Sequence, residues 1–183
     1  IEQQISGTGW HNLSNPFENQ TASSFGLVGT DRHPNAENLR QWNPEAAYVW
    51  ENISSGTAAL DPGRGYIGYF GNNPLGFASG LQLGTGPWTL SITGKPMTTV
   101  SPILHHYVKI AQNTWEGFVK DNETDGWNLV GNPFTSILDF STLTLPANVN
   151  NAFYIWTPNK VGGAGYVSWS GAGITDPYIA PLQ

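Results

Sequence analysis

The chain has 183 residues, of which 11% are charged and 13% are aromatic, and it contains 22 glycines, 13 prolines and no cysteine. The formal net charge of −6 argues against nucleic acids and anionic membrane surfaces as partners, because these polyanions bind basic patches. The lack of cysteine excludes disulfides and thiol chemistry, and the sequence has no apolar run of about 18 residues that would span a membrane as a helix.

The chain opens with residues 1–8, which are polar and predict a lead-in or edge strand. Trp10 begins the first predicted core strand, which ends at Asn15-Pro16. Proline has no N–H to give to a β-ladder, and it favours an extended conformation at the residue before it. Phe17 follows this corner, and we expect its ring to turn back onto the core.

The next segments alternate between loops and strands. Residues 18–43 are rich in Asn, Ser and Gly and predict a loop, whereas 47–50 and 65–70 are rich in aromatic and β-branched residues and predict strands. Two pairs of intervening strands are then predicted: 75–83 with 88–93, and 103–111 with 115–120. We expect the tip of the second pair at residues 112–114.

A nine-residue stretch then recurs. Residues 126–134, GWNLVGNPF, repeat residues 9–17, GWHNLSNPF, and share the Gly, Trp, Asn, Pro and Phe. We therefore predict one all-β domain over residues 1–183, with a pseudo-repeat of 9–70 and 126–183 around the intervening strands 75–120. The predicted fold is a β-sandwich of jelly-roll type, built from two related halves. We expect the two Asn-Pro corners to share one geometry, and we predict a cis peptide bond in both.

Acidic residues occupy alternate positions just before the second copy. Asp121, Glu123 and Asp125 precede Gly126, as at the start of a calcium loop. An EF-hand needs a bidentate acid at its twelfth position, which is Asn132 here, so that motif is excluded. A loose surface Ca²⁺ site at the three acids remains open, and a solvated turn is the favoured alternative. No cofactor other than this structural Ca²⁺ is predicted.

The sequence contains no recognisable catalytic constellation. His105 and His106 are adjacent, so on a strand they point to opposite faces and do not form a metal pair. His11 and His33 have no acidic or histidine partner at ligand spacing. There is no Gly-x-Ser-x-Gly elbow, and no pair of acids is placed for glycoside hydrolysis. We therefore expect the chain not to be an enzyme.

The eight tryptophans allow two interpretations, since exposed rings on a β-sheet stack on sugars whereas buried rings fill a core. Tryptophans at repeated strand positions are expected to serve the core: Trp10, Trp50, Trp127 and Trp156. Trp42, Trp88, Trp115 and Trp169 are less constrained. The candidate ligand-binding residues are Trp42, Trp88 and Trp115, with packing in the core or at a sheet edge as the favoured alternative.

Four segments carry a family resemblance: residues 62–66 (PGRGY), 126–134, 148–156 (NVNNAFYIW) and 178–183 (YIAPLQ). The chain resembles the β-rich region that precedes the C-terminal sorting domain in cargo proteins of the type IX secretion system. The resemblance covers most of the chain and is weakest across residues 98–125. It departs from the family pattern at Phe134, where Tyr is usual, at Thr135, where Pro is usual, and at Gln183, where an aromatic strand is expected to follow.

This resemblance implies export to the outer cell surface or the medium, and it brings no shared catalytic residues. The implied partners are neighbouring domains of a longer chain and the secretion machinery. Our first hypothesis is a non-catalytic exported module with an adhesion, spacer or assembly role. The second is a carbohydrate-binding module of a secreted polysaccharide-degrading enzyme, with surface glycans as ligands. We also expect residues 179–183 to lie at a domain boundary beside an open sheet edge.

Overall fold

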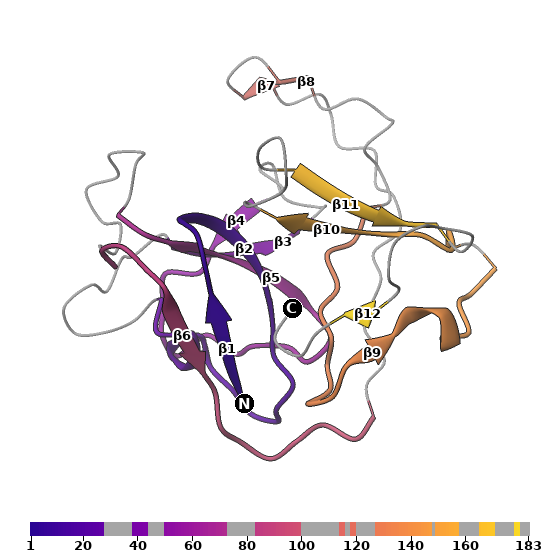
Figure 1. Cartoon of the computed structure of the whole chain (residues 1–183), viewed down its shortest axis with the longest axis horizontal. Helices are drawn as coiled ribbons and strands as arrows, with labels where there is room; N and C mark the ends of the chain where they lie inside the picture. Colours follow the sequence, from indigo (N-terminus) through magenta and orange to yellow (C-terminus); the bar gives the residue numbers. More distant parts are fainter. Residues whose placement is uncertain are drawn as a thin grey trace.

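The protein is all-β (Figure 1). The computed structural model describes residues 1–27, 38–43, 50–72, 83–99, 114–115, 118–119, 127–147, 149–157, 165–170 and 178–179. Its strands are β1 (Glu2–Ile5), β2 (Gly9–Ser14), β3 (Leu39–Trp42), β4 (Trp50–Asn52), β5 (Gly65–Phe70), β6 (Trp88–Ser91), β7 (Thr114–Trp115), β8 (Phe118–Val119), β9 (Leu138–Asp139), β10 (Phe153–Thr157), β11 (Gly165–Trp169) and β12 (Tyr178–Ile179). Two short 3-10 helices are described, η1 (Ala22–Phe25) and η3 (Phe140–Thr142). No helix in these residues is long and apolar enough to cross a membrane.

The central sheet has the strand order β2-β5-β3-β4, and every pairing in it is antiparallel. Directly paired residues share a face, so Leu13 of β2 lies on the same face as Tyr66 of β5. That face is the buried one, with Leu13 and Tyr66 at 1% and 0% exposure. The opposite face carries Trp10, whose ring lies edge-on to Tyr69 and under the guanidinium of Arg40.

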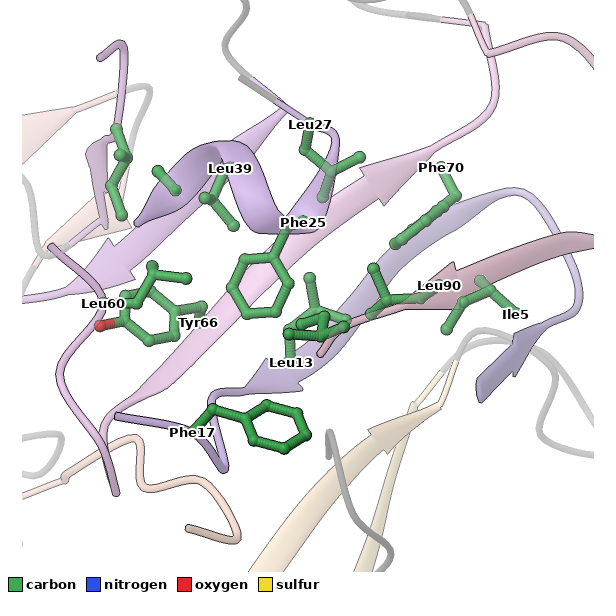
Figure 2. Packing of buried hydrophobic residues seen from close by; sticks show 13 residues of the cluster. Ile5, Leu13, Phe17, Phe25, Leu27, Leu39, Leu60, Tyr66, Phe70 and Leu90 are labelled. Carbon is green, nitrogen blue, oxygen red and sulfur yellow. The ribbon is translucent and has the colours of Figure 1, made fainter. Parts of the chain in front are cut away.

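The buried face of this sheet is covered by η1 and by the antiparallel pair β1–β6 (Figure 2). Thirteen buried residues form the resulting core: Ile5, Leu13, Phe17, Ala22, Phe25, Leu27, Leu39, Ile53, Leu60, Tyr66, Phe70, Leu90 and Ile92. The ring of Phe17 lies among them, as predicted for the residue after the corner. Burial raises the pKa of Tyr66 to about 12, and its hydroxyl accepts the backbone N–H of Asp61 at 2.7 Å.

The C-terminal part is built around the antiparallel pair β10–β11, with a second antiparallel pair, β9–β12. Strand β10 contacts β2 of the central sheet. Three rings form a separate aromatic cluster: Phe140 lies 4.7 Å from Phe153 and 5.4 Å from Trp169, between ring centroids. Phe140 and Trp169 are buried, so this cluster is the apolar centre of the described C-terminal residues.

The two copies of the repeated stretch meet at the start of β5. Ser14 pairs with Gly65 on one edge of that strand. On the other edge, Arg64 forms a β-bridge with Val130, and Gly65 N–H donates to the carbonyl of Leu129 at 3.0 Å. The second copy therefore continues the edge along which β3 pairs with β5.

Both Asn-Pro corners use the same hydrogen-bonded turn. The side-chain oxygen of Asn15 accepts the N–H of Phe17 at 3.0 Å, and that of Asn132 accepts the N–H of Phe134 at 2.9 Å. Each is an Asx turn, in which proline supplies the fixed φ of the residue between donor and acceptor. Both asparagines are completely buried. The only cis peptide bond among the described residues is Gly86–Pro87, so the cis prediction for the two corners is wrong.

The observed strand pairings add to those predicted from the sequence, and some differ from them. Strand β6 pairs with β1, while residues 75–82, its expected partner, lie outside the described residues, as do 103–111. In the predicted hairpin of 103–120, Thr114 pairs with Val119 and Trp115 with Phe118, so Thr114 lies in a strand and not at the predicted tip. The two predicted halves also differ in their pairing. In the C-terminal half β10 pairs directly with β11, whereas in the N-terminal half β3 lies between β4 and β5. These pairings establish the all-β class, and a jelly-roll strand order stays a prediction.

Candidate functional site

The β10–β11 pair has two aromatic faces, because its side chains alternate between them. Phe153 pairs with Trp169, and this face packs on Phe140 to form the buried cluster. The other face carries Tyr154 and Trp156 of β10, and Tyr166, which pairs with Trp156. Tyr154 and Tyr166 are exposed, so this second face is open to solvent.

Four rings form a continuous row on this open side, in the order Trp127, Tyr154, Tyr166 and Trp156. We call this set the aromatic row. The successive centroids are 5.0, 6.5 and 5.1 Å apart, and the successive interplanar angles are 74°, 88° and 71°. Trp127 is 49% exposed, Tyr154 45% and Tyr166 57%, while Trp156 is half-buried. Such a row of accessible rings is unusual on a soluble surface and marks a candidate binding site.

The backbone of Trp127 is anchored to the central sheet. The indole N–H of Trp42 donates to the carbonyl of Trp127 at 2.9 Å. Two residues later, the carbonyl of Leu129 accepts from Gly65, and Gly131 N–H donates to Gly63 at 3.1 Å. These bonds hold the start of the row against the end of β3 and the beginning of β5, and its other members lie on β10 and β11. The row therefore joins both parts of the described structure.

The aromatic row is uncharged. Strands β10 and β11 read FYIWT and GYVSW and contain no Lys, Arg, Asp or Glu. An aromatic ring presents a negative face and a positive edge, so accessible Tyr and Trp rings bind C–H groups and flat apolar faces, and their polar atoms can hydrogen-bond at the rim. A sugar ring has such a C–H face bordered by hydroxyl groups. The row therefore has the chemistry of a stacking surface.

Of the three tryptophans predicted to bind ligand, the two whose side chains are described, Trp42 and Trp88, pack in different places. Trp42 lies beside the row: it is half-buried, packs edge-on against Trp50 at 5.0 Å and bonds to Trp127. Trp88 packs against the core near Phe70, and its indole N–H donates to the carbonyl of Leu83 at 3.1 Å. This position favours core packing over ligand binding. The side chain of Trp115 lies outside the described residues.

The candidate metal site cannot be placed in the fold, because Asp121, Glu123 and Asp125 all lie outside the described residues. Within the part of the chain that is described, no group of three or more His, Asp or Glu residues could hold a metal ion. His11 bonds through Nε2 to the carbonyl of Gly7 at 2.9 Å, and its ring lies edge-on to Phe70. His33, His105 and His106 are likewise outside the described residues.

The sequence pointed to the core for two members of the row and did not single out the others. Trp127 was expected to be a core residue, and the structure corrects this, since half of its surface is exposed. The repeat suggested that Trp127 should be placed like Trp10, but the first copy pairs along six residues of β5 and the second only around Val130. The sequence carries little signal for this exposure, because a strand with two apolar faces, such as 153–156, is ordinarily buried on both of them.

Comparisons of the chain with protein-family models, with curated proteins and with solved structures each find no match.

Proposed function

We propose that the chain is an exported, non-catalytic adhesion module that binds glycans through the aromatic row. The observation that carries this proposal is the exposure of Trp127, Tyr154 and Tyr166 as one continuous series of rings. Export to the cell surface is supported by the resemblance to the region before the sorting domain of type IX cargo proteins. Both features fit a protein that contacts polysaccharide outside the cell.

The test of glycan binding is a glycan array probed with the whole chain and with a double variant, Trp127→Ala with Tyr166→Ala. We expect the wild type to bind a defined set of glycans and the double variant to lose at least tenfold in affinity, which corresponds to about 1.4 kcal/mol. Ile137→Ala is the matched control, because Ile137 is an exposed large apolar residue, at 64%, that belongs to no part of the row. Unchanged binding by the double variant would remove the row from the proposal.

Export is tested separately by labelling intact cells that express the native precursor with an antibody against this chain. Labelling without permeabilisation supports a surface location, and labelling only after permeabilisation contradicts it. A spacer role, in which a neighbouring domain covers the row, predicts a different result. The isolated chain would then bind no glycan, and the rings would become protected from solvent in the precursor.

A further inference from the structure

The lack of charge on the aromatic row indicates which class of glycan it would bind. This inference rests on the proposed glycan-binding function. Proteins recognise uronic acids and sulfate groups through Arg and Lys side chains, often as bidentate pairs. No such residue occurs on β10 or β11. Arg64, which reaches the carbonyl of Trp42 through Nη2, is already paired with Asp61 at 3.3 Å.

The net charge of the whole chain also favours neutral glycans over acidic ones. A net charge of −6 produces a field that slows the approach of polyanions and does not affect neutral ligands. With no cation in the row to offset this repulsion, an acidic or sulfated glycan would gain little from contact. A neutral glycan needs only stacking and hydrogen bonds, which tyrosine and tryptophan supply.

The orientation of the rings narrows the ligand further. Neighbouring rings in the row meet at 74°, 88° and 71°, so no two successive rings are coplanar. The flat face of a crystalline polysaccharide requires rings that lie in one plane. A single chain can instead turn about its glycosidic bonds and present successive sugars at different angles. The centroid steps of 5.0 to 6.5 Å are comparable with the length of one sugar residue.

We propose that the aromatic row binds neutral, soluble, single-chain glycans, in preference to polyanionic glycans and to crystalline polysaccharide surfaces. The exposed faces of Trp127 and Tyr166, the two most accessible rings, stack on the C–H faces of sugars along one chain. Sugar hydroxyl groups remain at the rim, where they bond to water and to nearby polar groups. Because no ion pair forms, the affinity does not depend on salt.

The experiment uses the whole chain against three classes of probe. Affinity gel electrophoresis is run with xyloglucan, galactomannan and mixed-linkage β-glucan as neutral soluble probes, and with alginate and dextran sulfate as polyanions. Pull-down assays are run with microcrystalline cellulose and chitin. We expect retardation by at least one neutral soluble glycan, unchanged by added salt, and at least tenfold weaker binding to the other two classes.

Variants tie the binding to the row. Trp127→Ala and Tyr166→Ala should each weaken binding at least tenfold, whereas Tyr166→Phe should stay within threefold, since it keeps the ring face. Ile137→Ala should bind like the wild type. Circular dichroism of each variant checks that the fold is retained, and Tyr166 is the cleaner site because its ring is the more exposed of the two.

The outcomes test the ligand class, the glycan-binding function and the role of the aromatic row separately. Salt-sensitive binding to alginate or dextran sulfate, or binding mainly to crystalline cellulose or chitin, overturns this inference and leaves glycan binding intact. Failure to bind any member of the three classes overturns the proposed function itself. Binding of a neutral glycan that is insensitive to both Trp127→Ala and Tyr166→Ala places the ligand elsewhere and overturns the role of the row.

Discussion

The two buried asparagines show how single residues hold the corners. The amide nitrogen of Asn15 donates to the carbonyls of Phe17 and Leu60 at 2.9 and 3.0 Å, while its oxygen accepts from Phe17. Asn132 makes the same Asx turn and donates to the carbonyl of Ser136 at 2.8 Å. A buried group that loses its partner costs more than a surface hydrogen bond contributes. The side-chain hydrogen bonds of these two asparagines therefore help to fix the corners.

Asn15→Ala should destabilise the protein by about 3 kcal/mol, on the order of 1 kcal/mol for each of the three hydrogen bonds lost. Urea denaturation followed by tryptophan fluorescence measures the change. Asn12→Ala on β2, the strand before the corner, is the control, because Asn12 is only half-buried, and it should cost less than about 1 kcal/mol. Equal losses for the two variants would show that the Asx turn does not stabilise the corner.

His11 makes the stability of the fold depend on pH in the acidic range. Desolvation by burial lowers the pKa of His11 below its ordinary value of 6.5, although the hydrogen bond to the carbonyl of Gly7 opposes this shift. The unfolded chain then takes up a proton at a higher pH than the folded one. The stabilising contribution is therefore complete above about pH 6.5 and is lost as the pH falls through the lower pKa of the folded state.

His11→Asn is the test, because Asn128 occupies the matching position of the second copy. Between about pH 8 and about pH 5, the free energy of unfolding of the wild type should fall more than that of the variant. Urea denaturation at several pH values measures both curves. Parallel curves would show that His11 titrates alike in the folded and unfolded chains.

At the scale of elements, the segment 127–131 is attached to β5 by a contact that needs glycine. A Cβ on Gly131 would lie 2.2 Å from the Cβ of Ser14 and 2.9 Å from the carbonyl oxygen of Arg64. Neither neighbour is the end of a flexible side chain, so the backbone would have to move. Ser14 also donates from Oγ to the carbonyl of Asn132 at 2.9 Å. The position before Asn in one copy therefore packs against the same position in the other.

Gly131→Ala should cost about 2 kcal/mol or more through overpacking. Ser14→Gly alone should cost about 1 kcal/mol for the lost hydrogen bond. The double variant should be at least about 1 kcal/mol more stable than the sum of the two changes predicts, because Ser14→Gly removes the atom that clashes. Gly84→Ala, at a φ of +72° but with open space around it, is the control and should be additive with Ser14→Gly. Additivity of the Gly131 pair would contradict the contact.

At the scale of the whole molecule, apolar burial is uneven among the described residues. The main core of thirteen residues lies entirely within residues 5–92, whereas the C-terminal part has the small cluster around Phe140 and Trp169 and exposes the aromatic row. Regions with less buried apolar surface open more easily. The C-terminal part is thus expected to open locally before the main core unfolds.

Native-state hydrogen exchange should show this order. Amides of β2 and β5 should exchange only through global unfolding, while those of β10 and β11 should exchange through a smaller opening. Gly131→Ala should speed exchange in β10 and β11 more than in β2 and β5, since it weakens the attachment of residues 127–131. A uniform exchange free energy across all four strands would show that the described structure unfolds as one unit.

Several elements could be predicted from local sequence alone. The strand from Trp10, the strand 65–70, the strands at 153–156 and 165–169, and the corner before Phe17 all follow from short-range signals. Aromatic and β-branched runs favour strands, and Asn-Pro ends them. The cis prediction failed because the Asn side chain, through its bond to the residue after proline, makes a tight turn with a trans peptide.

The sequence by itself determined the all-β class and the use of the same Asn-Pro corner in two distant segments. Both features depend on residues next to one another in the chain. Only the tertiary structure decided where the second copy lies and which rings remain exposed. Those outcomes depend on which strand edges are already occupied: β3 takes residues 66–68 of β5 and leaves 63–65 to the second copy. Trp127 consequently has the sequence context of a core residue and the position of a surface one.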